Sequence, residues 1–447
     1  MGQLAKFRGA ISGLVIAALL AGPALADPMP LDRALSLGLA RSPELGQAQA
    51  RSGAAEAVKD SAVRQWFPSV DLNGAAGLRH LENDARINLG LSALDERPLY
   101  ATIGVNQPLW DFGRRTNDAR TQRARLASAQ QEEEVAGEGA AYAIARAYLQ
   151  VLVQQRVVQA SQDNLAFHQN IAADVSEGVD KGAMSISERQ QANERLQGAK
   201  LALEQANADL GTARAELGLL VGSDNFEVVA PPDPSGVIPA SLDAALALAA
   251  TNDPRVHSME YRFRAAQSQA RRARSEFWPS VGLQGTIRAG KDFEGYAGTT
   301  RDYELLLVAR WNLFNGGVTS ARIREADHNA DEARFALGGA QRDSELQVRK
   351  AWIGLQSWRS RLETQQARLG VAGDVLISYR AQFGIGRRSL LDVLDAQNAV
   401  YNASVETEVA RTGALLAEYG LLAQLNQLRS FFGISKATID PKLYGPQ

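Results

Sequence analysis

The sequence consists of two halves that repeat each other at several places. Each half carries a Leu-Asp pair, at 31–32 and 242–243, followed by two aromatic residues and Pro-Ser-Val, at 66–70 and 277–281. Further along, Gly182 of the first half matches Gly386 of the second, and Ser185 matches Ser389. A repeated stretch of this kind represents one structural unit. The chain is therefore predicted to contain two copies of one unit: a helical segment, a strand region after the aromatic-Pro break, and a long helical pair.

The N-terminal residues have the composition of a secretory signal peptide. Lys6 and Arg8 precede a short apolar run, and Ala24-Leu25-Ala26 fits the small-x-small pattern of a cleavage site. We expect residues 1–26 to be removed and the mature protein to leave the cytoplasm. The chain has no cysteine, which excludes disulfides, thiolate metal sites and a lipidated N-terminal cysteine.

Charge and chemistry exclude several classes of function. The net charge is −2, whereas a nucleic-acid-binding protein normally has a strongly basic face. The four histidines are isolated and have no metal-ligand spacing. Gly384 and Gly386 do not form a nucleotide-binding loop, because a third glycine and a preceding strand are missing. We therefore predict no enzymatic activity, no catalytic residues and no cofactor.

Long helices are indicated by a seven-residue apolar spacing. It runs through both halves: Ile144, Val151, Val158, Leu165, Ala172 and Val179, then Val348, Leu355, Leu362, Leu369, Leu376 and Phe383. Residues 192–220 add a seam of alternating Ala and Leu. Such seams favour supercoiled helices, and an unbroken helix of about 65 residues would be about 100 Å long. Two interpretations fit these helices: a structural coiled coil, or the wall of a long helical tube.

Each helical pair is predicted to turn at a capped tip. Gly182 precedes Ser185-x-x-Glu188, and Gly386 precedes Ser389-x-x-Asp392. Glycine permits the left-handed exit from one helix, and the serine with the acid three residues later caps the next helix. The tips are therefore expected near residues 182–188 and 384–395.

Alternating apolar and polar residues predict two β-hairpins, at 68–112 and 279–314. This alternation is typical of transmembrane barrel strands. No later apolar stretch approaches the roughly 20 residues of a spanning helix, so a membrane crossing would require a closed barrel. One chain provides four strands and small barrels need about eight, so the barrel must be shared between copies. Three copies would provide twelve strands.

The sequence resembles the TolC family of outer-membrane efflux and secretion channels. The resemblance is carried by the stretch 383–397, Phe-Gly-Ile-Gly-Arg-Arg-Ser-Leu-Leu-Asp-Val-Leu-Asp-Ala-Gln, and by Pro-Leu-Trp-Asp-Phe-Gly at 108–113 with its counterpart at 312–317. It implies a mainly α protein with a β-barrel portion: a homotrimer in the outer membrane of a Gram-negative bacterium. A shared 12-stranded transmembrane β-barrel would lie in outer-membrane lipid above an internally duplicated, coiled-coil helical barrel in the periplasm.

The resemblance also divides the mature chain. It implies a first TolC-like repeat at 27–221, an inter-repeat linker at 222–241 in a belt around the tunnel, and a second repeat at 242–428. The C-terminal tail, 429–447, is expected to be poorly ordered.

The implied function is a passive exit duct in a type I secretion system. Its partners would be a periplasmic membrane-fusion adaptor and an inner-membrane ABC transporter. Many pump-dedicated relatives have a lipidated cysteine that this chain lacks, which favours protein secretion. The alternatives are the outer-membrane component of a drug or metal efflux pump, in which the transporter can be proton-driven, and a periplasmic coiled-coil scaffold without a pore.

The resemblance places the periplasmic entrance at the helical tips. Its gate residues would be Ser187, Glu188, Phe383, Arg388, Asp392 and Asp395. Asp392 and Asp395 share a helix face, so in a trimer they would form a carboxylate ring that favours cations and gives a possible cation site. Asp392 also fits a capping role. A Glu188–Arg388 pair would be a charge-assisted lock or two solvated charges.

Two further predictions concern the tips. Phe383 replaces an aromatic residue that usually has a hydroxyl in the family, so a hydroxyl-mediated link is absent there. The turns would contact the adaptor through Gly182, Ser185, Gly386 and Ser389.

Overall fold

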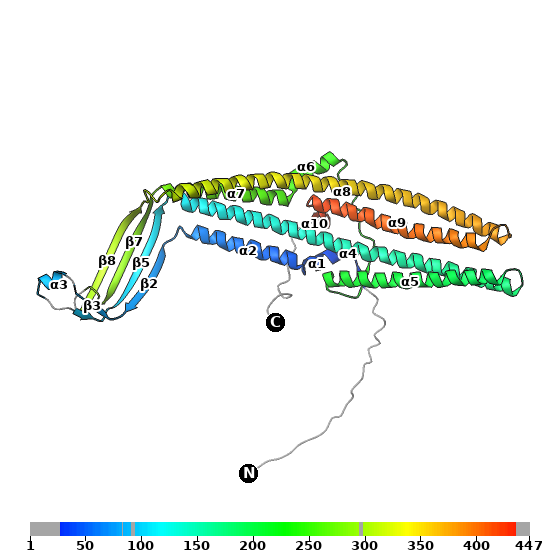
Figure 1. Ribbon diagram of the computed structural model, residues 1–447, viewed down its shortest axis with the longest axis horizontal. Coiled ribbons are helices and arrows are strands. Elements are labelled where there is room, and N and C mark those ends of the chain that lie inside the picture. Colours follow the sequence, from blue (N-terminus) through cyan, green and yellow to red (C-terminus); the bar gives the residue numbers. More distant parts are fainter. Residues whose placement is uncertain (1–26, 83, 91–93, 295–297, 435–447) are drawn as a thin grey trace, which may run out of the picture.

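The computed structural model describes residues 27–434, except 83, 91–93 and 295–297. The predicted signal peptide, 1–26, lies outside the described residues. The described chain forms a long bundle of helices with a small sheet at one end (Figure 1). Among these residues, no helix combines the length and the apolar character needed to cross a membrane.

Two long helices form the spine of the bundle. They are α4 (Arg114–Asp180) and α8 (Val318–Gly384), each with 67 residues, and therefore each about 100 Å long. Shorter helices lie end to end along them (Figure 1). They are α2 (Pro43–Arg64) and α5 (Ile186–Val221) beside α4, and α7 (Pro254–Arg274) and α9 (Leu390–Gln424) beside α8.

The middle of the bundle carries the largest apolar core. It includes α1 (Leu31–Leu39) and a parallel pair of strands, β1 (Asp27–Met29) and β6 (Phe226–Val228). A separate, smaller core lies between α6 (Leu242–Asn252), α8 and α9. Tyr148 is fully buried in the largest core, and its hydroxyl donates to the Met29 carbonyl oxygen at 2.8 Å. Burial raises the pKa of Tyr148 to about 12. The β1–β6 pair was not among the predicted elements.

The four main strands form one antiparallel sheet in the order β2-β5-β7-β8. Their bounds are β2 (Ser69–Ala76), β5 (Leu99–Trp110), β7 (Ser280–Lys291) and β8 (Thr299–Arg310). Among the described residues, the outer edges of β2 and β8 have no partner strand. The tip of the first hairpin carries three additional elements: β3 (Arg79–Leu81), α3 (Asp84–Asn88) and β4 (Leu94–Glu96), with β3 paired to β4.

The helix seam is buried differently from the prediction. On α5 the alanines of the seam are buried, whereas Leu203 and Leu210 are only half-buried in the single chain. On α4 the buried positions towards the tip include Ser161, Asn164 and His168, and the predicted Leu165 is half-buried. A straight helix drifts by about 20° per heptad, so a strict seven-residue spacing does not stay on one face.

The prediction of a poorly ordered tail is wrong for its first residues. Residues 428–431 form a short helix, α10 (Leu428–Phe431), that docks on α4. Arg429 is buried and forms ion pairs with Glu134 and Glu138. These buried charges explain the order, because an unpaired buried carboxylate costs several kcal/mol. Residues 435–447 lie outside the described part of the chain.

Candidate channel entrance

The first tip is built by a glycine turn and a capped helix. Gly182 has φ +73°, and the backbone N–H of Ala183 donates to the Gly178 carbonyl oxygen at 2.8 Å. Ser185 then caps α5: its Oγ accepts from the Glu188 N–H at 3.2 Å, and its own N–H donates to Glu188 Oε2 at 2.8 Å. The capping box predicted from the sequence is therefore present.

The second tip repeats this chemistry between α8 and α9. Gly386 also has φ +73°. Ser389 Oγ accepts from the Asp392 N–H at 3.2 Å, and the Ser389 N–H donates to Asp392 Oδ2 at 3.3 Å. Gly386 and Ser389 are exposed, as are their counterparts Gly182 and Ser185.

A small apolar core joins the two helical hairpins, α4–α5 and α8–α9, behind their tips. Its buried residues come from three helices: Ile171 and Val175 on α4, Ala192 on α5, and Leu390 and Leu394 on α9. Phe383 packs half-buried against this core. The two tips of one chain are thus held together by burial, which is consistent with the apolar residue found at 383.

A layer of polar side chains lies further from the tips than this apolar core. Gln397 donates its side-chain N–H to Asn164 Oδ1 at 2.9 Å, and the Ser161 and Tyr401 hydroxyls lie 3.0 Å apart. His168 is buried near them, and its Nδ1 has no hydrogen-bond partner among the described residues. Burial and the neighbouring Arg195 lower the pKa of His168.

Arg388 contacts its own hairpin. Its guanidinium lies 4.0 Å from the centre of the Tyr379 ring, 3.3 Å from Gln382 Oε1 and 3.8 Å from Asp392 Oδ2. Glu188 is engaged in its capping box instead. The structure therefore does not bring Glu188 and Arg388 together within one chain, because each side chain already has a local partner. Ser187 is exposed on the first turn of α5.

Asp395 has a partner on the other helical hairpin, which no sequence motif indicated. Arg195 on α5 donates from Nη2 to Asp395 Oδ1 at 3.1 Å, across the boundary between the two hairpins. The side chains remain accessible, with 37% of Arg195 and 58% of Asp395 exposed. No local motif could have predicted this pair, because it depends on how α5 packs beside α9.

Among the described residues, no group of three or more His, Cys, Asp or Glu side chains could hold a metal ion within one chain. The possible cation site at Asp392 and Asp395 therefore stays a prediction.

Comparison with known proteins identifies the family. Residues 34–223 and 245–430 match the family described as outer membrane efflux protein. The chain belongs to this family. The two matched stretches also correspond to the two halves of the internal repeat, and the resemblance to TolC-type channels is confirmed.

Individual relatives agree with this assignment. The outer membrane efflux protein BepC of Brucella suis is 23% identical over 367 residues, covering 80% of this chain and 79% of BepC. The alkaline protease secretion protein AprF of Pseudomonas aeruginosa is 28% identical over 200 residues, covering 44% of this chain and 40% of AprF. The CmeC outer membrane channel of Campylobacter jejuni has a TM-score of 0.78 at 15% identity, with 99% of both chains covered, which shows the same fold.

The chain is thus an outer-membrane channel protein of a family with a periplasmic tunnel. Within the chain, the helical tips lie at the end far from the sheet (Figure 1).

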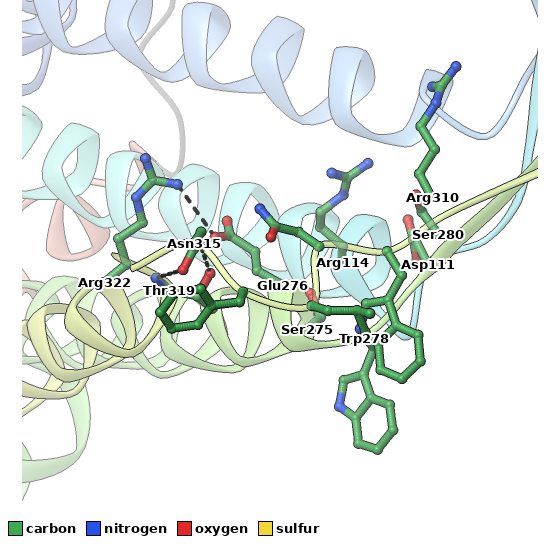
Figure 2. A pocket seen from close by; sticks show the side chains of 14 residues that line it. Asp111, Arg114, Ser275, Glu276, Trp278, Ser280, Arg310, Asn315, Thr319 and Arg322 are labelled. Carbon is green, nitrogen blue, oxygen red and sulfur yellow. Dashed lines mark hydrogen bonds and ion pairs between the residues drawn. The ribbon is translucent and has the colours of Figure 1, made fainter. Parts of the chain in front are cut away.

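A pocket of about 830 Å³ lies where the sheet of this family member meets its helices (Figure 2). Arg322 lies 3.7 Å from Glu276, and Asn315 donates to the Thr319 hydroxyl at 2.8 Å. These contacts fix the connection between β8 and α8. The pocket is at the opposite end of the bundle from the tips, so it is not part of the entrance.

Proposed function

We propose that three copies of the chain assemble side by side into a channel. The edge of β8 in one copy would pair with β2 of the next, which closes three four-stranded sheets into one of twelve strands. The support is the pair of edges without a partner strand among the described residues, together with apolar side chains that are exposed in the single chain: Leu305 is 71% exposed and Leu307 is 69% exposed. Lipid cannot satisfy an open strand edge, so closure is required.

The helices would close into a tunnel in the same assembly. Leu203 and Leu210 are half-buried in the single chain, and contact with a neighbouring copy would complete their burial. At the end of the tunnel, Asp392 and Asp395 from each copy would surround the entrance. A ring of carboxylates favours cations.

The assembly would serve as the exit duct of a type I secretion system. A periplasmic adaptor would contact the exposed turns at Gly182, Ser185, Gly386 and Ser389, and an inner-membrane ABC transporter would drive export. The observation that carries the proposal of secretion is the similarity to AprF, whose name describes protease secretion. The similarity to the efflux protein BepC over most of the chain favours the second candidate, an efflux pump component.

Deletion of the gene distinguishes the two candidates. A secretion duct predicts that a protein disappears from the culture medium, that the intact gene restores it, and that tolerance to drugs and metals is unchanged. Loss of tolerance with an unchanged set of secreted proteins would instead support the efflux pump. If the channel protein itself were found in the soluble periplasm, both candidates would be contradicted and the scaffold would be supported.

A further inference from the structure

Arg195, on α5 of the first helical hairpin, contacts a carboxylate on α9 of the second. Its Nη2 donates to Asp395 Oδ1 at 3.1 Å, and its Nε lies 3.6 Å from Glu194 on the same helix. Asp395 occupies one of the two predicted ring positions at the entrance. A positive charge is therefore fixed beside one carboxylate of that ring in every copy of the chain.

We propose that Arg195 is a specificity-determining residue of the channel entrance. By offsetting the charge of Asp395, it weakens the attraction of the entrance for cations and keeps multivalent cations from binding tightly in the mouth. This inference rests on the proposed function, because it requires the tips of three copies to surround a conducting opening.

The geometry supports a role in charge rather than in stability. Arg195 is 37% exposed and Asp395 is 58% exposed, and ion pairs that water reaches contribute little to folding. The other ring residue, Asp392, has only a longer contact of 3.8 Å with Arg388, whose guanidinium stacks on Tyr379. The closest cation to either ring carboxylate is therefore Arg195.

The expected effect follows from Coulomb's law. A unit charge about 10 Å from a trivalent cation in water at about 0.1 M salt, repeated in three copies, changes the affinity of that cation about tenfold. Removal of the Arg195 charge should thus tighten block by a trivalent cation about tenfold. Removal of the Asp395 negative charge in the same protein should cancel the effect, because the two changes in charge are opposite in sign.

The test uses the full-length trimer in planar lipid bilayers, with hexamminecobalt(III) added on the tip side. Arg195→Gln should raise cation selectivity and tighten block about tenfold, whereas Arg195→Lys, which keeps the charge, should behave like the wild type. Arg195→Gln combined with Asp395→Asn should return close to wild-type block. Arg214→Gln is the matched control: Arg214 is exposed on the same helix, 19 residues further from the tip, or about 28 Å at 1.5 Å per residue.

The outcomes separate this inference from the proposed function. A conducting wild type in which Arg195→Gln leaves selectivity and block unchanged would overturn the role of Arg195 and leave the channel intact. Equal effects of Arg195→Gln and Arg214→Gln would also overturn it. A positive charge beside Asp395 would then affect block no more than a positive charge far from the tip. A correctly assembled wild type that does not conduct at all would overturn the proposed function itself.

Discussion

Replacement of Arg429 by alanine should destabilise the middle of the bundle. Arg429 and Glu138 are each only 7% exposed, and the Arg429 Nε lies 3.0 Å from Glu138 Oε1. The Arg429 backbone N–H also donates to Glu138 Oε1, at 3.3 Å. The guanidinium lies so close to α4 that a Cβ at Gly137 would be 2.7 Å from Nη1. Arg429→Ala would therefore leave a buried carboxylate without its cation.

The size of the effect follows from that geometry. Removal of one partner of a buried ion pair costs about 3–5 kcal/mol. At about 2.1 cal/mol/K per residue, roughly 400 residues that unfold together have an unfolding entropy of about 0.8 kcal/mol/K, so the thermal midpoint should fall by about 4–6 °C.

The pH dependence gives a second signature. Burial already raises the pKa of Glu138 above its ordinary value, and Arg429 opposes this rise. In Arg429→Ala the pKa of Glu138 should rise further. A carboxyl whose pKa is raised on folding contributes stability at low pH that is lost as the pH increases through the folded pKa. The defect should therefore be small in acid and grow towards neutral pH.

The assay is thermal unfolding followed by helical circular dichroism, at one scan rate for all variants. The matched control is Arg429→Met combined with Glu138→Met, which removes both charges and should recover most of the loss. An unchanged midpoint in Arg429→Ala would refute the reasoning. A double variant as unstable as the single one would show that packing, rather than the charge, is responsible.

Three further predictions concern the tips and the seam. Because the pKa of His168 is lowered on folding, stability should fall as the pH drops below about 6.5; His168→Leu should lose this dependence in thermal scans, and identical pH profiles would contradict it. Leu394→Ala, at a fully buried site between the hairpins, should cost about 3–5 kcal/mol and increase single-channel conductance; unchanged stability would argue against that core. Leu210→Asp should reduce the yield of trimer in detergent extracts, since it would place an unpaired charge at a contact between copies; a normal yield would exclude that contact.

Local chemistry explains what the sequence could predict. The capping boxes at Ser185 and Ser389 involve residues three apart, and the left-handed turns at Gly182 and Gly386 require glycine, so both tips were visible in the sequence. The alternating strands and the long Pro-free helices were visible for the same reason. The internal repeat then indicated that both hairpins contribute to one structure, and a single four-stranded sheet is observed.

Contacts between distant segments explain what could not be predicted. The Arg195–Asp395 pair joins residues on different helical hairpins, and the β1–β6 pair joins residues 27–29 to residues 226–228 of the predicted linker. The docking of Arg429 depends on two glutamates nearly three hundred positions earlier. The buried polar residues Ser161, Asn164 and His168 could not be predicted from an apolar seam. The hydrogen-bond partners of Ser161 and Asn164 come from α9, and His168 Nδ1 has none among the described residues.

The most direct test of the central claim is disulfide cross-linking between the two sheet edges. The chain has no cysteine, so any disulfide cross-link between copies must come from the introduced cysteines. The register across β5 and β7 places Leu72 of β2 on the same face as Tyr303, Leu305 and Leu307 of β8. Leu72→Cys, combined in turn with a cysteine at each of these positions, should give a covalent trimer at one register after oxidation in the outer membrane. Monomer at every register, with the protein intact in that membrane, would contradict the shared sheet.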